Sequence, residues 1–412
     1  MPEPPLERSV SGNLDYHEEV ATEYDRARRP LYSDGTGTCR IVNRGLCIET
    51  TDGELVKYDA KRLGSAAALA QIQGTVLAST SLWLHVGLYV LMATSVGVAV
   101  ELCSERPELI SGEKIREVVN YMSLFVAVTL ALYVAVVIER WWEMRNTMLG
   151  GLWCAVDDLT MVLAVHFPRR EHRRFKTLIL RYCLLSVELM FMEAQGSEVD
   201  MGELCRRHLL RTDEREKLEK LASKPQVVWV WIAGTLQRLA EAGKLPSRLL
   251  VSLYGICAKA RGALGGVSAH LDTQLPFTYV HLLSVVVHVN NLLVALKCGV
   301  LSAIAIWNLR RPETRKSPIS DAENLQVLLL QIFCVVGIPF FNLGLLEVGV
   351  LVGNPLSNKF QDFPRSAFHM WMRDECEALQ TTAEEAPAEI SRVTEKVKFK
   401  DQSLVQDCVV VV

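Results

Sequence analysis

The sequence predicts an all-helical integral membrane protein with four transmembrane helices and a large helical cytosolic region. Half of the 412 residues are hydrophobic and only 22% are charged. The apolar residues are concentrated in uninterrupted blocks, whereas a soluble protein spreads them over amphipathic faces. Alternating polar and apolar patterns of the kind that form strands are almost absent. Composition and pattern therefore favour a membrane-spanning helical fold over a disordered or soluble chain.

Four long apolar blocks are predicted to span the membrane. The first begins at residue 75 and runs for about 26 residues without a formal charge, enough to cross a hydrocarbon core of roughly 30 Å. The predicted spans are 75–100, 121–140, 277–307 and 325–352. The third contains Lys297 and the fourth Glu347, which inside a membrane are expected to face protein or water. Four such blocks disfavour the alternative, buried helices of a large soluble protein.

The segments outside these blocks define three further regions. Residues 1–58 are polar and acidic and are expected to be flexible, residues 142–276 form a helical cytosolic region, and residues 374–412 form a C-terminal tail. The central region is rich in arginine and lysine, which places it and both termini in the cytosol by the positive-inside rule. The acidic start holds no signal peptide, so the first transmembrane helix is expected to direct insertion.

The sequence shows no pattern typical of catalysis. It contains no paired cysteines, no zinc-binding histidine motif, no phosphate-binding glycine loop and no nucleophile elbow. We therefore expect no enzymatic activity, no cofactor and no nucleic-acid partner. Two alternatives to a transport function stay open: a membrane enzyme with unrecognised ligands, and a non-conducting scaffold that docks partners through its acidic start and its tail.

Several segments together resemble one protein family. Residues 131–145, ALYVAVVIERWWEMR, resemble the end of the second transmembrane helix of bestrophins, and Arg140, Trp141 and Trp142 form a charged and aromatic motif typical of a membrane boundary. The segments RLGS, PFTYVHLL and LLEVGVLVGNP follow the family order at 62–65, 276–283 and 345–355. The resemblance covers Asp59 to Arg373 and implies a homopentameric channel, with the membrane lipid around it, that passes chloride or bicarbonate.

The resemblance also implies a narrow pore neck lined by the second transmembrane helix. The matching positions are Leu124, Val128 and Leu132. Residues at i, i+4 and i+8 share one helix face, so a symmetric ring would stack them as three apolar rings. Such a constriction gates by dewetting. The alternative is that these side chains pack against neighbouring helices.

Two further family features map onto this chain. A cytosolic constriction falls at Arg248 or the preceding Ser247, where an arginine ring would attract anions; the alternative is a surface arginine paired with an acid. A calcium clasp maps to Asp59, Asn354, Asn358 and Asp362. Calcium requires about six to eight oxygen ligands, and Lys359 adds a positive charge, so the clasp is degraded and calcium binding is expected to be weak. The plasma membrane is the favoured location, with a chloroplast or thylakoid membrane as the alternative.

Overall fold

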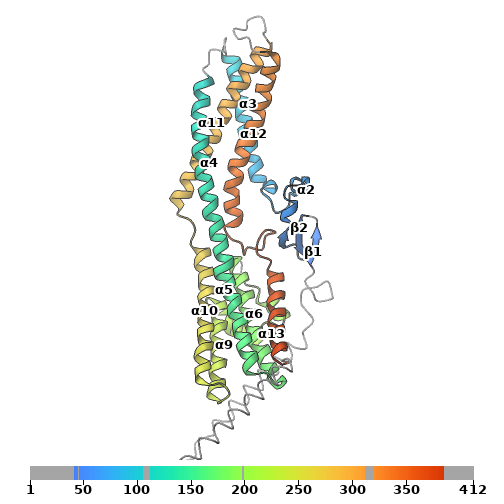
Figure 1. Cartoon of the computed structure of the whole chain (residues 1–412). Coiled ribbons are helices and arrows are strands. Elements are labelled where there is room, and N and C mark those ends of the chain that lie inside the picture. The colour runs from blue at the N-terminus through green and yellow to red at the C-terminus, as the bar shows by residue number, and fades with distance from the viewer. Residues whose placement is uncertain (1–40, 45, 105–111, 197–198, 311–319, 385–412) are drawn as a thin grey trace, which may run out of the picture.

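The computed structural model describes residues 41–44, 46–104, 112–196, 199–310 and 320–384. These residues form two helical bundles that follow one another along a common long axis (Figure 1). The membrane bundle consists of α3 (Thr80–Cys103), α4 (Gly112–Glu143), α11 (Phe277–Arg310) and α12 (Asp321–Val352). All four are long and apolar enough to cross a membrane, which confirms the prediction of four membrane helices.

The second bundle, here called the helical extension, continues away from the membrane bundle. Its elements are η4 (Met144–Leu149), α5 (Gly150–His166), η5 (Arg170–His172), α6 (Arg173–Ala194), α7 (Met201–Arg206), α8 (Thr212–Glu219), α9 (Lys224–Glu241), α10 (Ser247–Asp272) and α13 (Arg365–Glu384). The short elements η1 (Ala60–Arg62), α2 (Ala66–Ala70) and η2 (Val76–Ala78) precede α3. The π-helical turn η4 joins α4 to α5, so one helical stretch of 54 residues, Glu113–His166, runs through both bundles.

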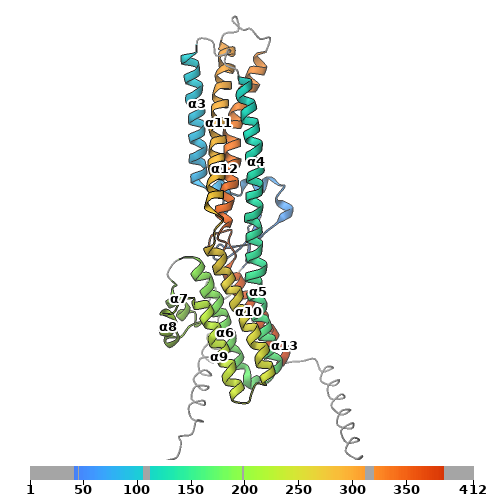
Figure 2. The same ribbon diagram turned by 90° about the vertical axis from the view of Figure 1, so that its left-hand side faces the viewer.

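In the membrane bundle α11 packs against each of the other three helices, with α3 and α4 on opposite sides of it (Figure 2). Side-chain hydrogen bonds between these helices reinforce the packing. Tyr89 of α3 lies 2.7 Å from the Nδ1 atom of His288, and Ser123 of α4 donates to the Oδ1 atom of Asn290 at 3.0 Å. Asn342 of α12 donates to the neighbouring Asn291 at 2.8 Å. Polar pairs of this kind hold membrane helices together where the lipid supplies no hydrophobic driving force.

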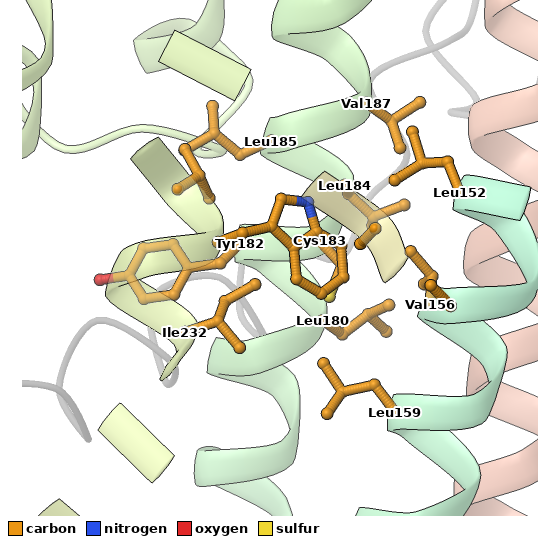
Figure 3. Close-up of a cluster of buried hydrophobic side chains, with 14 of the residues drawn as sticks. Leu152, Val156, Leu159, Leu180, Tyr182, Cys183, Leu184, Leu185, Val187 and Ile232 are labelled. Atoms are coloured by element: carbon orange, nitrogen blue, oxygen red, sulfur yellow. The ribbon is translucent and has the colours of Figure 1, made fainter. Parts of the chain in front are cut away.

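The core of the helical extension is built around α6. Residues 176–192 of this helix are all buried, which is unusual for a helix and requires neighbours on every side. Figure 3 shows its side chains, Leu180 and Leu184 among them, meeting Leu152, Val156 and Leu159 of α5 and Ile232 of α9. The fully buried Trp229 donates through its indole nitrogen to Ser186 at 3.0 Å.

A small antiparallel sheet lies beside the junction of the two bundles (Figure 1). Its strands β1 (Ile41–Arg44), β2 (Cys47–Thr50) and β3 (Leu55–Tyr58) pair in sequence order. The sequence predicted a flexible segment over residues 1–58 and gave no indication of this sheet, since strands of four residues carry almost no periodic signal. Residues 1–40 of that segment, and residues 385–412 of the predicted tail, lie outside the described residues.

Candidate functional site

The predicted neck residues form an exposed apolar strip on α4. Leu124, Val128 and Leu132 are 66%, 55% and 60% exposed in the isolated subunit. The opposite face of the same helix, with Val126 and Leu130, is fully buried against the bundle. The strip therefore does not belong to the core of its own subunit. It is an uncharged surface that faces outward from the membrane bundle.

The rotation of α4 about its axis is fixed by a polar contact next to this strip. Ser123 precedes Leu124 and donates to Asn290, which is completely buried in α11. Because consecutive helical residues are turned by about 100°, this bond directs Leu124 away from α11. Sequence reasoning missed Asn290 and Asn291, although a pair of asparagines inside an apolar block is a usable signal for a buried polar contact.

The boundary motif Arg140, Trp141 and Trp142 connects the two bundles. The Arg140 guanidinium donates to the carbonyl oxygens of His270 at 2.9 Å and Thr273 at 2.6 Å. These carbonyls end α10, where backbone acceptors lack helical partners and the helix dipole favours a positive charge. The Trp141 ring packs against Phe363, with centroids 5.0 Å apart, whereas Trp142 is half exposed. The motif thus caps a helix of the extension and also contributes an exposed aromatic ring.

Ser247 and Arg248 lie at the start of α10, where the chain has turned back from α9. Both side chains are exposed, at the end of the helical extension that is farthest from the membrane bundle. Among the described residues the Arg248 guanidinium forms no ion pair, in contrast to many arginines of the extension. An unpaired arginine at the first turn of a helix places two positive features together, since the helix N-terminus also carries positive charge.

Asp59 and Asn354, which are expected in the calcium clasp, form other hydrogen bonds. Asp59 accepts a hydrogen bond from the backbone of Lys61 at 3.0 Å and pairs with Arg62 at 3.4 Å. Asn354 donates to the carbonyl of Ala194 at 2.9 Å and accepts from the backbone of Leu356 at 3.0 Å. Asn358 adopts a left-handed backbone with φ of 65°.

Asp362 stabilises the turn in which it lies. Its Oδ2 atom accepts from the Ser357 hydroxyl at 2.6 Å and from the backbone of Lys359 at 2.9 Å. Burial raises the pKa of Asp362 in spite of these two hydrogen bonds. Among the described residues no group of three or more histidine, cysteine, aspartate or glutamate side chains is placed to hold a metal ion.

Acids of the small sheet make direct contact with the segment after α12. Glu54 accepts from the backbone of Ser366 at 3.1 Å, Asp52 accepts from the Ser366 hydroxyl at 2.7 Å, and Leu55 donates to the carbonyl of Phe360 at 2.9 Å. Ser366 lies in the first turn of α13, where backbone donors are free and negative charge is favoured. Burial raises the pKa of Glu54, although the Ser366 donors oppose the shift. No local sequence signal predicts this contact, because the partners are far apart in the chain.

A second set of buried charges surrounds α6. Glu188, 0% exposed, accepts from Arg207 at 2.7 Å and from Arg365 at 2.6 Å, and the Nδ1 atom of His369 lies 2.6 Å from it. Arg181 of the same helix donates to Glu214 of α8 at 2.6 Å. Buried charges of this kind persist only when they are paired and hydrogen-bonded. Glu188 therefore ties α13 to the centre of the helical extension.

A match to a known protein family identifies the kind of protein that these two bundles form. Residues 59–366, most of the chain, match the model described as Bestrophin, RFP-TM, chloride channel. The chain belongs to the bestrophin family. It is therefore a multi-pass membrane protein of an anion channel family, which confirms the prediction that it is not an enzyme. Membership also implies an oligomeric channel.

Solved structures support the bestrophin fold. A mutant of a bacterial bestrophin homolog from Klebsiella pneumoniae is 15% identical, with a TM-score of 0.57, and covers 74% of this chain and 99% of its own. The same homolog, phased with zinc, is 16% identical with a TM-score of 0.54, and covers 71% and 98%. A structure titled as a membrane protein is also 16% identical, with a TM-score of 0.57 and coverage of 73% and 99%. No curated protein compared with this bestrophin matches it.

Proposed function

We propose that this bestrophin forms a homopentameric channel that passes chloride, bicarbonate or both, with Leu124, Val128 and Leu132 lining its neck. The observation that carries the proposal is the outward strip on α4, which is apolar, uncharged and excluded from the core of its own subunit. In a ring with α4 innermost, the strip would form stacked apolar rings that disfavour water. Weakly hydrated anions lose water at lower cost than strongly hydrated cations do, so such a neck selects by hydration.

The helical extension is proposed to lie in the cytosol and to continue the pore. It begins where α4 passes directly into α5, so a neck on α4 leads along the same axis into the extension. Arg248, or Ser247 beside it, would form a second ring at the far end. An unpaired arginine there would raise the local concentration of anions and repel cations. We place this channel in the plasma membrane, with a chloroplast or thylakoid membrane as the alternative.

Shortening the neck side chains is expected to increase anion current. Val128→Ala and Leu132→Ala each remove apolar volume from one ring, which lowers the barrier to water and ions and should raise single-channel conductance or open probability severalfold. The measurement is recording from the purified protein in planar bilayers, with chloride and bicarbonate compared. Leu91→Ala, at an exposed apolar position on α3, is the matched control. Unchanged currents in both neck variants would place the pore lining on another helix, and a silent wild-type protein would favour a scaffold.

Reversing the charge at Arg248 is expected to reduce anion flux. Arg248→Glu replaces an attractive ring with a repulsive one, and the loss should be larger at low salt, where charges are screened less. Lys220→Glu, at the exposed residue that follows α8, makes the same change in net charge and serves as the control. Equal currents in Arg248→Glu and wild type at low salt would assign Arg248 to the outer surface.

Calcium is expected not to be the main opener of this channel. The segment after α12 offers Asp362, two asparagine amides and a lysine. The carboxylate of Asp362 already accepts hydrogen bonds from Ser357 and Lys359 within its own turn. Sites that respond to micromolar calcium normally gather several carboxylates. Currents should therefore persist when calcium is chelated during recording and in Asp362→Asn. The idea fails if chelation and the substitution both abolish the current.

A further inference from the structure

Two histidines lie side by side across the contact between α3 and α11 in the membrane bundle. The imidazole rings of His85 and His288 have their centroids 6.0 Å apart and are inclined by 44°. His85 follows the start of α3 at Thr80 by five residues, or about 8 Å along the helix axis. The pair is therefore close to the end of the bundle that joins the helical extension (Figure 1). Titratable side chains are rare in membrane helices and commonly mark a functional site.

A hydrogen bond to the backbone fixes the protonation of His85. Its Nδ1 atom lies 2.7 Å from the carbonyl oxygen of Ser81, one helical turn earlier. A carbonyl only accepts, so Nδ1 carries the proton, and the Nε2 atom of the neutral ring keeps a free lone pair. Histidines that bind metal ions are usually held in this way, with one ring nitrogen donating to an acceptor and the other bound to the metal.

The hydroxyl of Tyr89 holds His288 in a comparable way. Its oxygen lies 2.7 Å from the Nδ1 atom of His288, and a phenol accepts as well as donates. When the phenol accepts, the lone pair of His288 is also on Nε2. Neither Nε2 atom has a hydrogen-bond partner in the part of the chain that the structure describes. The Nε2 atom of His288 is not sealed within the protein, whereas the amide nitrogens of Asn290 and Asn291 on the same helix are.

The separation of the two rings suits a single metal ion between them. Zinc binds imidazole nitrogen at about 2.0 to 2.1 Å, so two imidazoles on one ion have their ring centroids roughly 5 to 6 Å apart. Imidazole nitrogen favours zinc and neighbouring transition metals, whereas calcium and magnesium prefer oxygen. Glu347 of α12 accepts from Ser79 at 3.2 Å beside the start of α3. This acid lies at the same end of the bundle and offsets part of the charge of a bound cation.

We propose that His85 and His288 bind one divalent transition-metal ion such as zinc through their Nε2 atoms, with water completing its coordination. Tyr89 and the carbonyl of Ser81 orient the two rings and are not ligands. Two protein ligands leave open positions, so the ion is held reversibly and less tightly than in a closed site of four. It links α3 to α11 in addition to their direct packing. This binding does not depend on the proposed conduction of anions.

The test is chemical protection of histidines in the detergent-purified full-length protein, first freed of metal with a chelator. Diethyl pyrocarbonate modifies accessible neutral imidazoles, and mass spectrometry of peptides measures the modification of each histidine. Micromolar zinc is expected to protect His85 and His288 with the same half-maximal concentration, because one ion covers both. Magnesium should protect neither. His281, an exposed histidine about two turns before His288 on α11, is the matched control and should stay reactive.

Three variants connect the effect to the pair. In His85→Gln the zinc concentration that protects His288 should rise at least about tenfold, whereas His281→Gln should leave it unchanged. Tyr89→Phe keeps the ring but removes the oxygen beside Nδ1, and it should weaken protection about tenfold. Zinc that leaves both histidines of the wild-type pair reactive overturns the proposal. Protection of the two at different concentrations overturns it as well, since it assigns them to separate ions. The wild-type comparison does not depend on the folding of any variant.

Discussion

Glu188→Gln is expected to unfold the helical extension at temperatures at which the wild-type protein remains folded. The substitution keeps the shape of the side chain but removes the negative charge that Arg207 and Arg365 share at 2.7 Å and 2.6 Å. Glu203, 3.2 Å from Arg207, compensates only partly because it is more exposed. Breaking a buried ion pair from one side typically costs about 3 to 5 kcal/mol. Thermal unfolding and limited proteolysis of the detergent-purified protein measure the effect.

A matched variant separates this loss from a general effect of charge. Glu219 pairs with Arg215 on the surface of α8 at 3.3 Å, so Glu219→Gln should cost at most about 1 kcal/mol. If both variants melt together with the wild type, Glu188 does not hold α13 in place.

The same charges give the expected response to acid. Burial raises the pKa of Glu188, but His369 and Arg365 outweigh it and hold that pKa below its usual range. Burial lowers the pKa of His369 more than Glu188 raises it, with Arg207 and Arg373 also opposing its protonation. Both groups thus resist protonation in the folded protein more than in the unfolded chain, and the stability that they contribute is lost as pH falls. Melting temperature should therefore decrease from pH 7 downward, first through His369 and then through Glu188.

Gly299→Ala is expected to separate α3 from α11 and to prevent assembly of the membrane bundle. A Cβ atom at this position would lie 2.4 Å from the backbone oxygen of Ala93 and 3.0 Å from Val96. A backbone carbonyl within a helix cannot move aside as a flexible side chain does, so the helices themselves must shift, at a cost of about 1 to 3 kcal/mol or more. Because small residues permit close contact between membrane helices, the loss extends over the whole interface.

The measurement is the yield of monodisperse protein after detergent extraction and its melting temperature. Gly87→Ala provides the control. Gly87 lies in α3, and a Cβ atom at this position would have no neighbouring atom within 4 Å. Equal yield and stability of the two variants would show that α3 and α11 tolerate separation at this crossing.

The sequence predicted the membrane helices well because long apolar blocks are a local signal. The choice of Leu124, Val128 and Leu132 came from the resemblance to bestrophins, and helical spacing adds only that the three residues share one face of α4. The contacts of Glu54 with Ser366 and of Glu188 with His369 could not be predicted from the sequence. They join residues whose proximity is set by the packing of the whole chain, and their acids look like ordinary surface acids in the sequence. Arg140 illustrates the same limit: the boundary motif was recognised, but its role in capping α10 was not.

The link between the small sheet and α13 has a consequence for biogenesis. Glu54 and Ser366 are 312 positions apart, and all four membrane helices and most of the helical extension lie between them in the chain. During synthesis the acids of the sheet have no partner until nearly the entire channel subunit has left the ribosome. Closing so long a loop is entropically costly before the intervening helices pack, and fast afterwards. The contact is therefore expected to form last. Its presence would distinguish a completed subunit from a truncated or misinserted one.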